Sequence, residues 1–350
     1  MTEYPGTKPV PPRHQFNEAN LATWLARNLA GFEGSLSIRQ FEGGQSNPTY
    51  LLQAPSGLWV LRKKPPGKLI ASAHAIDREY RVLKALADSD VPTPRPRIYC
   101  EDETVIGTQF YLMDFVPGRI FTDPLLPGFA SAERAAIYDA MNDTLARLHR
   151  IDWRAAGLGD YGRPENYFSR QIARWQKQYE QTRTEVVPTM ESLMAWLLAH
   201  VPDDQTAAIA HGDFRIGNLI FDSSAPRVIA VLDWELSTIG HPLGDLAYNC
   251  MTYHLPMEDE VSGGFVGADI GALGIPAEAD YIAAYGRRTG FELAPLWRFG
   301  MAFSLFRTAA IQQGIYARSL QGNASSSTAH LFGASFKRVA EAGWLVASGA

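Results

Sequence analysis

This sequence has few cysteines, no excess of basic residues and no long apolar run, and each absence argues against a class of protein. Only Cys100 and Cys250 occur in 350 residues, too few for a disulfide framework, so two packed free thiols and a reducing compartment are expected. The formal net charge of −5 argues against nucleic-acid binding, which usually accompanies a basic excess. No run approaches the roughly 18 apolar residues of a membrane-spanning helix, and the N-terminal stretch lacks the apolar core of a secretory signal. A cytoplasmic protein without nucleic-acid or membrane partners is expected.

What the sequence does contain is a set of polar residues between positions 211 and 235. The string HGDFRIGN (residues 211–218) places Asn218 five positions after Asp213, and VLDWE (residues 231–235) adds Asp233. Apolar runs at 219–221 and 228–232 predict two short strands joined by a turn at 222–226, a hairpin that would bring Asn218 and Asp233 together beside Asp213. A solvated loop with an edge-strand aspartate is the alternative. The spacing favours the hairpin, because it matches the H-R-D-x-x-x-x-N motif of kinases with glycine in the arginine position.

Phosphoryl transfer from a nucleotide needs such a set of groups. Asp213 is predicted to be the catalytic base that orients the acceptor hydroxyl, while Asn218 and Asp233 supply the hard oxygen ligands that Mg²⁺ prefers. Arg215 either neutralises charge on the transferred γ-phosphoryl group or is a surface arginine. His211 is predicted to be a structural hydrogen-bonding group that holds the loop.

These motifs resemble those of the aminoglycoside phosphotransferase and choline kinase group of small-molecule kinases. Within that group, the resemblance is greatest to the kinase-like domains that are fused to acyl-CoA dehydrogenases. It rests on HGDFRIGN followed by DWE and extends from about residue 38 to residue 310. It implies an ATP- and Mg²⁺-dependent O-phosphotransferase that acts on the hydroxyl group of a small molecule.

The apolar pattern along the chain agrees with a bilobal protein-kinase-like fold of the α+β class. Residues 1–15 predict an extended arm, and residues 16–29 a helix capped by Asn17 or Asn20. Strands are expected at 36–41, 49–52 and 58–62, a helix at 75–87, and strands at 97–100 and 110–115. After a hinge at 116–118, helices are expected at 130–150, 167–182, 189–200, 276–290, 293–319 and 329–347. The expected domains are an N-lobe with an antiparallel sheet at 1–115 and a mostly helical C-lobe at 116–350.

Nucleotide-binding residues are expected in the N-lobe. A glycine-rich loop between the first two strands lets backbone N–H groups approach phosphates, although glycine pairs are also common in hairpins. The resemblance adds two residues of the connection between the lobes, whose backbone would contact adenine. The expected set comprises Gly43, Gly44, Gln45, Ser46 and Asn47 in the loop, and Met113 and Phe115 in the connection.

The resemblance also assigns roles to charged residues that no motif marks. Arg62 stands where protein kinases carry the phosphate-binding lysine, with Glu79 on the following helix as its partner and Lys64 as the fallback. Asp245 would brace the catalytic loop. Glu235 either forms a salt bridge, which is the favoured interpretation, or contacts a second metal ion.

The acceptor site is expected in the helical lobe. That lobe is not unusually acidic, with one short cluster at 258–260, which argues against a polycationic aminoglycoside. The resemblance suggests a hydroxyacyl-CoA or a hydroxy acid instead. Candidates by location alone are Trp175, Tyr179, Tyr248, Tyr253, His254, Phe303, Phe306 and Arg307, although an aromatic stripe at helical spacing is more typical of a core.

Three other interpretations are open at this point. A nucleotide-binding pseudokinase or scaffold usually lacks one of Asp213, Asn218 and Asp233, and all three are present. A kinase of an amino alcohol or a sugar would use the same residues on another acceptor. An acyl-CoA dehydrogenase is disfavoured, because no strand–G-x-G-x-x-G–helix unit is evident and the kinase-like set leaves too little chain for a flavin domain.

Overall fold

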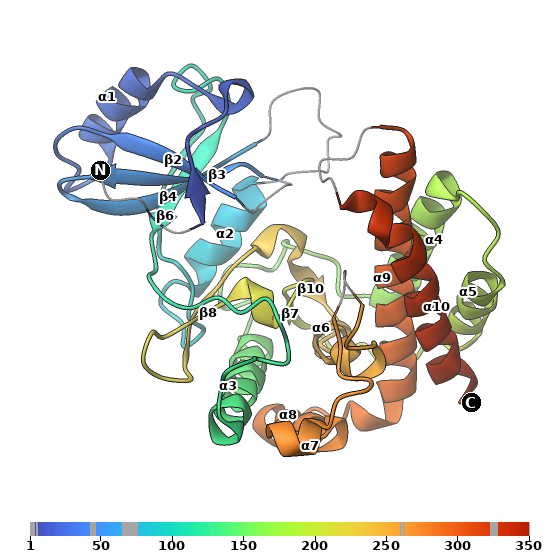
Figure 1. Ribbon diagram of the computed structural model, residues 1–350. Helices are drawn as coiled ribbons and strands as arrows, with labels where there is room; N and C mark the ends of the chain where they lie inside the picture. Colours follow the sequence, from blue (N-terminus) through green and yellow to red (C-terminus); the bar gives the residue numbers. More distant parts are fainter. Residues whose placement is uncertain are drawn as a thin grey trace. The chain divides into compact units, whose positions relative to one another are not determined.

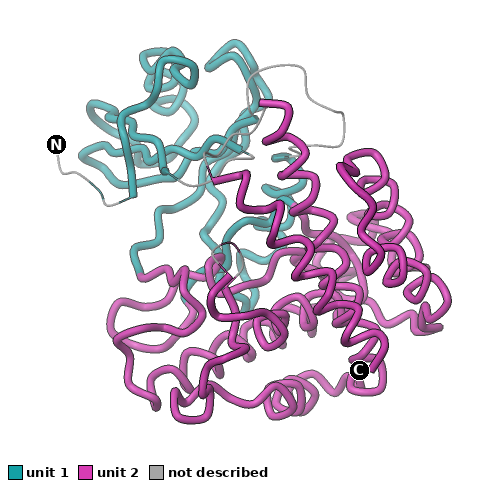
Figure 2. Tube along the Cα trace, turned by 45° about the vertical axis from the view of Figure 1, so that its right-hand side comes forward, with its two compact units in different colours: residues 1–118, 229–235 teal, residues 119–228, 236–350 magenta. Residues whose placement is uncertain are grey.

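The computed structural model divides the chain into two compact units (Figure 2). It describes Tyr4 and residues 6–42, 47–64, 76–259, 261, 263–322 and 328–349. The first unit comprises Met1–Gly118 together with Ile229–Glu235, and the second comprises Arg119–Val228 and Leu236–Ala350. Seven residues from late in the chain therefore belong to the unit that the N-terminal part forms.

A six-stranded antiparallel sheet forms the first unit (Figure 1). The spatial order of its strands is β1-β2-β3-β4-β6-β5. All five neighbouring pairs are antiparallel. The strands are β1 (Thr7–Lys8), β2 (Ser37–Phe41), β3 (Thr49–Ala54), β4 (Gly57–Lys63), β5 (Pro96–Cys100) and β6 (Phe110–Asp114), with helices α1 (Glu18–Asn28) and α2 (Ile76–Leu86). The predicted order of strands and helices in this part of the chain is confirmed.

Side-chain alternation along β4 separates the core of the first unit from its charged residues. Successive side chains of a strand point to opposite faces of the sheet. Leu61 and Trp59 belong to the hydrophobic cluster that includes Leu21 and Leu25 of α1, whereas the next residue, Arg62, points to the other face, where it pairs with Glu79 of α2.

The described part of the N-terminal arm, Tyr4 and residues 6–15, is largely extended, as predicted, and it also contributes a strand. β1 pairs with the outer strand β2, and Pro12–His14 form a 3₁₀ turn. The side chain of Asn17 caps α1 by accepting a hydrogen bond from the Asn20 backbone N–H (2.9 Å), which is one of the two caps that the sequence allows.

Helices dominate the second unit. They are α3 (Ser131–Arg150), α4 (Tyr167–Thr182), α5 (Pro188–Ala199), α6 (Leu243–Asn249), α7 (Ile270–Leu273), α8 (Glu278–Thr289), α9 (Trp297–Leu320) and α10 (Phe332–Ser348). α9 packs against α4, α6 and α10, and residues 299–307 are all buried, so this stretch is surrounded by protein on every side. Among the described residues, no helix has both the length and the apolar character that crossing a membrane requires.

Short strands flank the predicted catalytic loop. β8 (Leu219–Phe221) and β9 (Val228–Val231) occupy the two predicted strand positions, and in the turn between them the Asp222 N–H donates to the Arg227 carbonyl (2.8 Å). A second pair, which the sequence analysis missed, joins β7 (Ala208–Ala210) to β10 (Thr238–Gly240) in antiparallel register. β7 and β8 therefore hold the two ends of the loop that carries Asp213.

Candidate active site

The carboxylate of Asp213 is held at both of its oxygens. Oδ2 accepts a hydrogen bond from the side-chain amide of Asn218 (2.8 Å), and Oδ1 accepts one from the hydroxyl of Tyr248 (2.5 Å). The same amide of Asn218 also donates to the carbonyl of Asp213 (2.9 Å), because the 3₁₀ turn Ile216–Asn218 brings the end of the loop back toward its start. A carboxylate with a fixed orientation is suited to position a hydroxyl group.

The backbone before Asp213 makes a turn that requires glycine. Gly212 has a φ of 86°, and a Cβ atom at this position would lie 2.7 Å from the carbonyl oxygen of Leu236. The following Asp213 N–H donates to Nδ1 of the buried His211 (3.1 Å). This contact agrees with the structural role that the sequence analysis gives to His211, and the glycine explains why the kinase arginine is replaced at this position.

Asp245 braces the catalytic loop, as predicted. Its two carboxylate oxygens accept the backbone N–H groups of His211 (2.5 Å) and Gly212 (2.8 Å). His149 on α3 lies 3.2 Å from the same carboxylate and 2.6 Å from the hydroxyl of Tyr285. Burial alone raises the pKa of Asp245, but its hydrogen bond and charge interaction with His149 outweigh that effect and hold the pKa below its usual range. The brace is therefore an ionised, buried carboxylate.

Arg215 lies next to Asp213 but is largely open to solvent. Its Nε atom is 3.7 Å from Oδ1 of Asp213, and 55% of its side chain is exposed. An exposed pair at this distance contributes little to stability. A part for Arg215 in phosphoryl transfer stays a prediction.

The first unit contains a buried cluster of charges around Arg62. Its Nη1 atom is 2.9 Å from Oε1 of Glu79, and its Nη2 atom is 3.3 Å from Oδ1 of Asp233 and 3.9 Å from Oε2 of Glu235. The predicted Arg62–Glu79 ion pair is present, and the salt-bridge interpretation of Glu235 agrees with these contacts. Lys64 instead donates to the side chain of Gln109 (3.3 Å), so Arg62 rather than Lys64 is the partner of Glu79, and the phosphate contact of Arg62 stays a prediction.

Burial changes the titration of this cluster. The exposed fractions of Arg62 and Glu79 are 7% and 1%. Burial raises the pKa of Glu79 to about 7, against the lowering effect of the Arg62 charge. Burial also lowers the pKa of Arg62, but the negative charges of Glu79, Asp233 and Glu235 raise that pKa above its usual range. Arg62 is thus a permanent cation beside a carboxylate that titrates near neutrality.

Asp233 has a strained backbone. Its φ of 66° lies in the left-handed region, which non-glycine residues occupy rarely and at a cost of about 1–3 kcal/mol. Its side chain is 38% exposed. A residue that is held in a strained conformation and offers a carboxylate to solvent is a functional candidate on structural grounds as well.

The donor atoms of Asn218 and Asp233 fit Mg²⁺. The side chain of Asn218 donates two hydrogen bonds through its amide nitrogen, whereas its Oδ1 accepts none from the residues that the structure describes. Amide and carboxylate oxygens are the hard ligands that Mg²⁺ prefers. Asn218 belongs to the second unit and Asp233 to the first, and their convergence on one ion stays a prediction.

Most of the predicted glycine loop lies outside the described residues, namely Gly43, Gly44, Gln45 and Ser46. Asn47 is buried, and its side-chain amide donates to Oε2 of Glu235 (3.1 Å) within the first unit. Met113 lies in β6 opposite Val60, and the Phe115 N–H donates to the carbonyl of Leu58 (3.4 Å). The nucleotide contacts of the loop and of the connection stay predictions.

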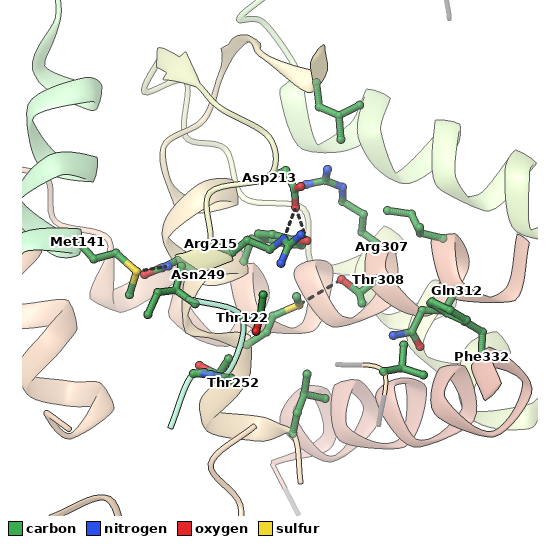
Figure 3. Close-up of a pocket in the computed structure, with 18 of the residues that line it drawn as sticks. Thr122, Met141, Asp213, Arg215, Asn249, Thr252, Arg307, Thr308, Gln312 and Phe332 are labelled. Carbon is green, nitrogen blue, oxygen red and sulfur yellow. Dashed lines mark hydrogen bonds and ion pairs between the residues drawn. The ribbon is translucent and has the colours of Figure 1, made fainter. Parts of the chain in front are cut away.

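The second unit has a cavity of about 460 Å³ beside Asp213 (Figure 3). Its charged lining residues are Asp213, Arg215 and Arg307, two guanidinium groups and one carboxylate. α9 lines it with Arg307, Thr308, Ile311, Gln312 and Ile315, which recur at the spacing of one helix face. Most of the other walls are apolar and include Met141, Met251, Leu255 and Phe332.

Of the acceptor-site candidates named by location, only Tyr248 and Arg307 line this cavity. Tyr179, Phe303 and Phe306 are fully buried in the core. Trp175 is also buried and packs beneath the guanidinium of Arg307 (5.5 Å to the ring centroid). The Tyr253 hydroxyl donates to the carbonyl of Pro276, and His254 contacts Glu278. These six residues do not line this cavity, and the four buried ones pack in the core, which is typical of aromatic residues at helical spacing.

A family model supports the resemblance that the motifs indicate. The model described as "Phosphotransferase enzyme family" matches residues 37–296, which is most of the chain. The chain belongs to this phosphotransferase family. The match includes the catalytic loop and both strands that flank it, so the phosphotransferase motif read from HGDFRIGN lies inside the family's own domain.

Two solved structures show which fold this phosphotransferase has. A crystal structure from Ralstonia eutropha, assigned provisionally as an aminoglycoside phosphotransferase, has a TM-score of 0.88 and 48% identity, covering 96% of this chain and 99% of that chain. A thermostable mutant of an aminoglycoside phosphotransferase, solved with AMP-PNP and hygromycin B, has a TM-score of 0.61 and 17% identity, covering 95% and 99% of the two chains. The predicted kinase-like α+β fold is confirmed, and the chain is a kinase-type phosphotransferase.

Curated relatives of the phosphotransferase are longer proteins. "Acyl-CoA dehydrogenase family member 10" of Mus musculus is 45% identical over 97% of this chain and 32% of its own length. "Acyl-CoA dehydrogenase family member 11" of Gallus gallus is 46% identical over 98% of this chain and 45% of its own length. The chain therefore spans less than half of the length of each of these two relatives.

Proposed function

We propose that this phosphotransferase moves the γ-phosphoryl group of ATP, in the presence of Mg²⁺, to a hydroxyl group of an anionic acyl compound such as a hydroxyacyl-CoA or a hydroxy acid. The observation that carries the proposal is the cavity beside Asp213. It combines two guanidinium groups, one carboxylate and mostly apolar walls. The oxygen of the acceptor hydroxyl would bond to the γ-phosphorus while the bond to ADP breaks, and the hydroxyl proton would leave toward Asp213.

The chain's own residues would orient the reactants. Asp213 would hold the attacking hydroxyl, and its two fixed oxygens make that orientation definite. Mg²⁺, held through Asn218 and Asp233, would supply positive charge to the phosphate oxygens. Arg62 would contact the phosphates as a permanent cation, with Glu79 keeping its guanidinium in place.

Further support for the nucleotide comes from fold relatives. The hygromycin-bound neighbour was crystallised with AMP-PNP, and another neighbour was crystallised with ADP and spectinomycin. For this chain, the proposed nucleotide contacts are Gly43, Gly44, Gln45, Ser46, Asn47, Arg62, Met113 and Phe115.

The charge of the cavity favours an anionic acceptor over an aminoglycoside. Two guanidinium groups against one carboxylate repel a polycation and attract a carboxylate or a phosphate. Burying an acyl chain against the apolar walls contributes about 0.8 kcal/mol for each CH₂ group. The names of the curated relatives agree with acyl chemistry but describe much longer proteins.

A kinetic panel tests the acceptor class. ATP consumption is measured with a chain-length series of hydroxyacyl-CoAs, the matching free hydroxy acids, choline, a sugar and kanamycin, for wild type, Asp213→Asn and the control Asp139→Asn, which lies on an exposed face of α3. We expect turnover with the hydroxyacyl compounds, rising with chain length until the cavity is filled, and its loss in Asp213→Asn alone. Efficient phosphorylation of kanamycin without activity on any acyl compound would overturn the acceptor class. Nucleotide binding without turnover on any acceptor, in wild type as in Asp213→Asn, would favour a pseudokinase.

A further inference from the structure

Helix α6 makes hydrogen bonds to the catalytic loop through two residues that lie one turn apart. Asp245 accepts the backbone N–H groups of His211 and Gly212. Tyr248, three residues later on the same helix, donates its hydroxyl to the side chain of Asp213. Residues at positions i and i+3 lie on one face of a helix, so a single turn of α6 sets both the path of the loop and the direction of its carboxylate.

The ring of Tyr248 is itself fixed by a neighbouring cation. The guanidinium of Arg307 lies 5.3 Å from the centroid of this ring and donates a hydrogen bond to the carbonyl of Gly212. Burial, and next the charge of Asp213, raise the pKa of Tyr248 well above its usual range, so the phenol keeps its proton and acts as the donor. Arg307, Gly212, Asp213 and Tyr248 thus form a closed set of contacts around the carboxylate.

Two hydrogen-bond donors, Asn218 and Tyr248, restrict the rotation of the Asp213 carboxylate, which a single donor would allow. The torsion that orients a carboxylate on its Cβ is broad and roughly two-fold. With Asn218 alone on Oδ2, the carboxylate of Asp213 could turn and carry Oδ1 away from the acceptor. Tyr248 stops this rotation through a 2.5 Å hydrogen bond. Arg215, at 3.7 Å from Oδ1 and largely exposed, is too far away to replace it.

We infer that Tyr248 is a positioning residue for phosphoryl transfer, which acts by holding the Asp213 carboxylate in the orientation that receives the acceptor hydroxyl. This inference rests on the proposed function of Asp213. It predicts an effect on the rate of transfer rather than on nucleotide binding, because the transition state is loose and depends on orientation. The proposed nucleotide contacts all belong to the first unit, whereas Tyr248 belongs to the second.

Tyr248→Phe tests the inference, because it removes only the hydroxyl and keeps the ring beneath Arg307. The matched control is Tyr161→Phe, which loses a similarly short hydrogen bond of a buried tyrosine (2.6 Å between the hydroxyls of Tyr161 and Ser237), and neither of these residues lines the cavity. Both variants, wild type and Asp213→Asn are compared in kcat, in KM for ATP and for the acceptor, and in thermal unfolding. We expect kcat of Tyr248→Phe to fall about 10- to 100-fold, with KM for ATP unchanged, while Tyr161→Phe keeps the wild-type kcat.

The outcomes separate this inference from the proposed function. If wild type is active, Asp213→Asn is inactive and Tyr248→Phe matches Tyr161→Phe in kcat, the positioning role is refuted while the role of Asp213 stands. An equal fall of kcat in both Phe variants that follows their loss of thermal stability would assign the Tyr248 hydroxyl to folding and refute the inference as well. Full activity of Asp213→Asn would overturn the proposed function itself.

Discussion

Replacing Glu79 by glutamine should reveal that the buried ion pair with Arg62 weakens the first unit near neutral pH. The pKa of Glu79 is raised from 4.5 to about 7 in the folded chain. Between these two values the folded state keeps a proton that the unfolded state releases, so the free energy of unfolding falls as the pH rises. Below pH 4.5 the side chain is protonated in both states and contributes no such pH dependence. Glutamine has the same shape and does not titrate.

The expected change in the free energy of unfolding follows from the interval between the two pKa values of Glu79, 4.5 and about 7. Each pH unit corresponds to about 1.4 kcal/mol, so wild type should lose up to about 3 kcal/mol relative to Glu79→Gln as the pH rises from 4.5 to 7. Above pH 7 the difference should stay constant. The direction agrees with the general observation that burying two charges costs more than their attraction returns unless the geometry is very good.

Hydrogen exchange read by mass spectrometry in peptides from β4 and α2 measures this effect in the first unit alone. Asp114→Asn is the control, because its ion pair with Arg97 belongs to the same unit but is exposed (43% and 30% of the two side chains). It should change stability by less than about 1 kcal/mol. The raised pKa of Glu79 would be refuted if the stability difference between wild type and Glu79→Gln did not change from pH 4.5 to 7. It would also be refuted if wild type became the more stable of the two as the pH rises.

Three further substitutions have definite expected results. Gly212→Ala should lower stability by more than about 1 kcal/mol and greatly reduce activity, because the new Cβ atom would meet Leu236 at a residue with a positive φ. The control is Gly157→Ala, where φ is also positive but the space around a Cβ atom is open. It should cost less stability in thermal unfolding, and equal costs would contradict the steric argument. Arg62→Lys should raise KM for ATP several-fold without abolishing activity, since it keeps the charge and loses the planar fork; wild-type kinetics would count against a phosphate contact. Asp233→Ala should weaken Mg²⁺·ATP binding in calorimetry, and unchanged affinity would remove it from the metal site.

The order of elements in both units could largely be predicted, because it depends on local sequence patterns. Alternating apolar residues mark the strands, and the helix from Tyr167 to Thr182 appears in the structure at the predicted residues. Boundaries shift where local chemistry intervenes. The predicted helix at 293–319 starts as a helix only at Trp297, because residues 294–296, with Pro295 among them, form a 3₁₀ turn first.

The missed features depend on contacts between residues that are far apart in the sequence. β7 and β10 have three residues each, too few to show a period, and they exist because they pair with each other. Tyr248 is a candidate for the acceptor site by location only, and neither its hydrogen bond to Asp213 nor the contact of His149 with Asp245 could be predicted before the fold brings these residues together. Asp213, Asn218 and Asp233 could be named from the sequence because their predicted roles depend on residue type and spacing, whereas Asp245 could be named only through the family resemblance, and the contact of Tyr248 carries no such signal.

Because residues 229–235 belong to the first unit, this unit obtains all of its residues only after the second unit's first segment has been synthesised. Val231 donates its N–H to the carbonyl of Pro92, and Asp233 and Glu235 flank Arg62. When residue 118 has been synthesised, Arg62 can reach only Glu79 of these partners. At typical elongation rates, the other two carboxylates follow on the order of ten seconds later. All six strands of the first unit's sheet are present once residue 118 has been synthesised, but Arg62 has only one of its three carboxylate partners until the residues after the catalytic loop have also emerged.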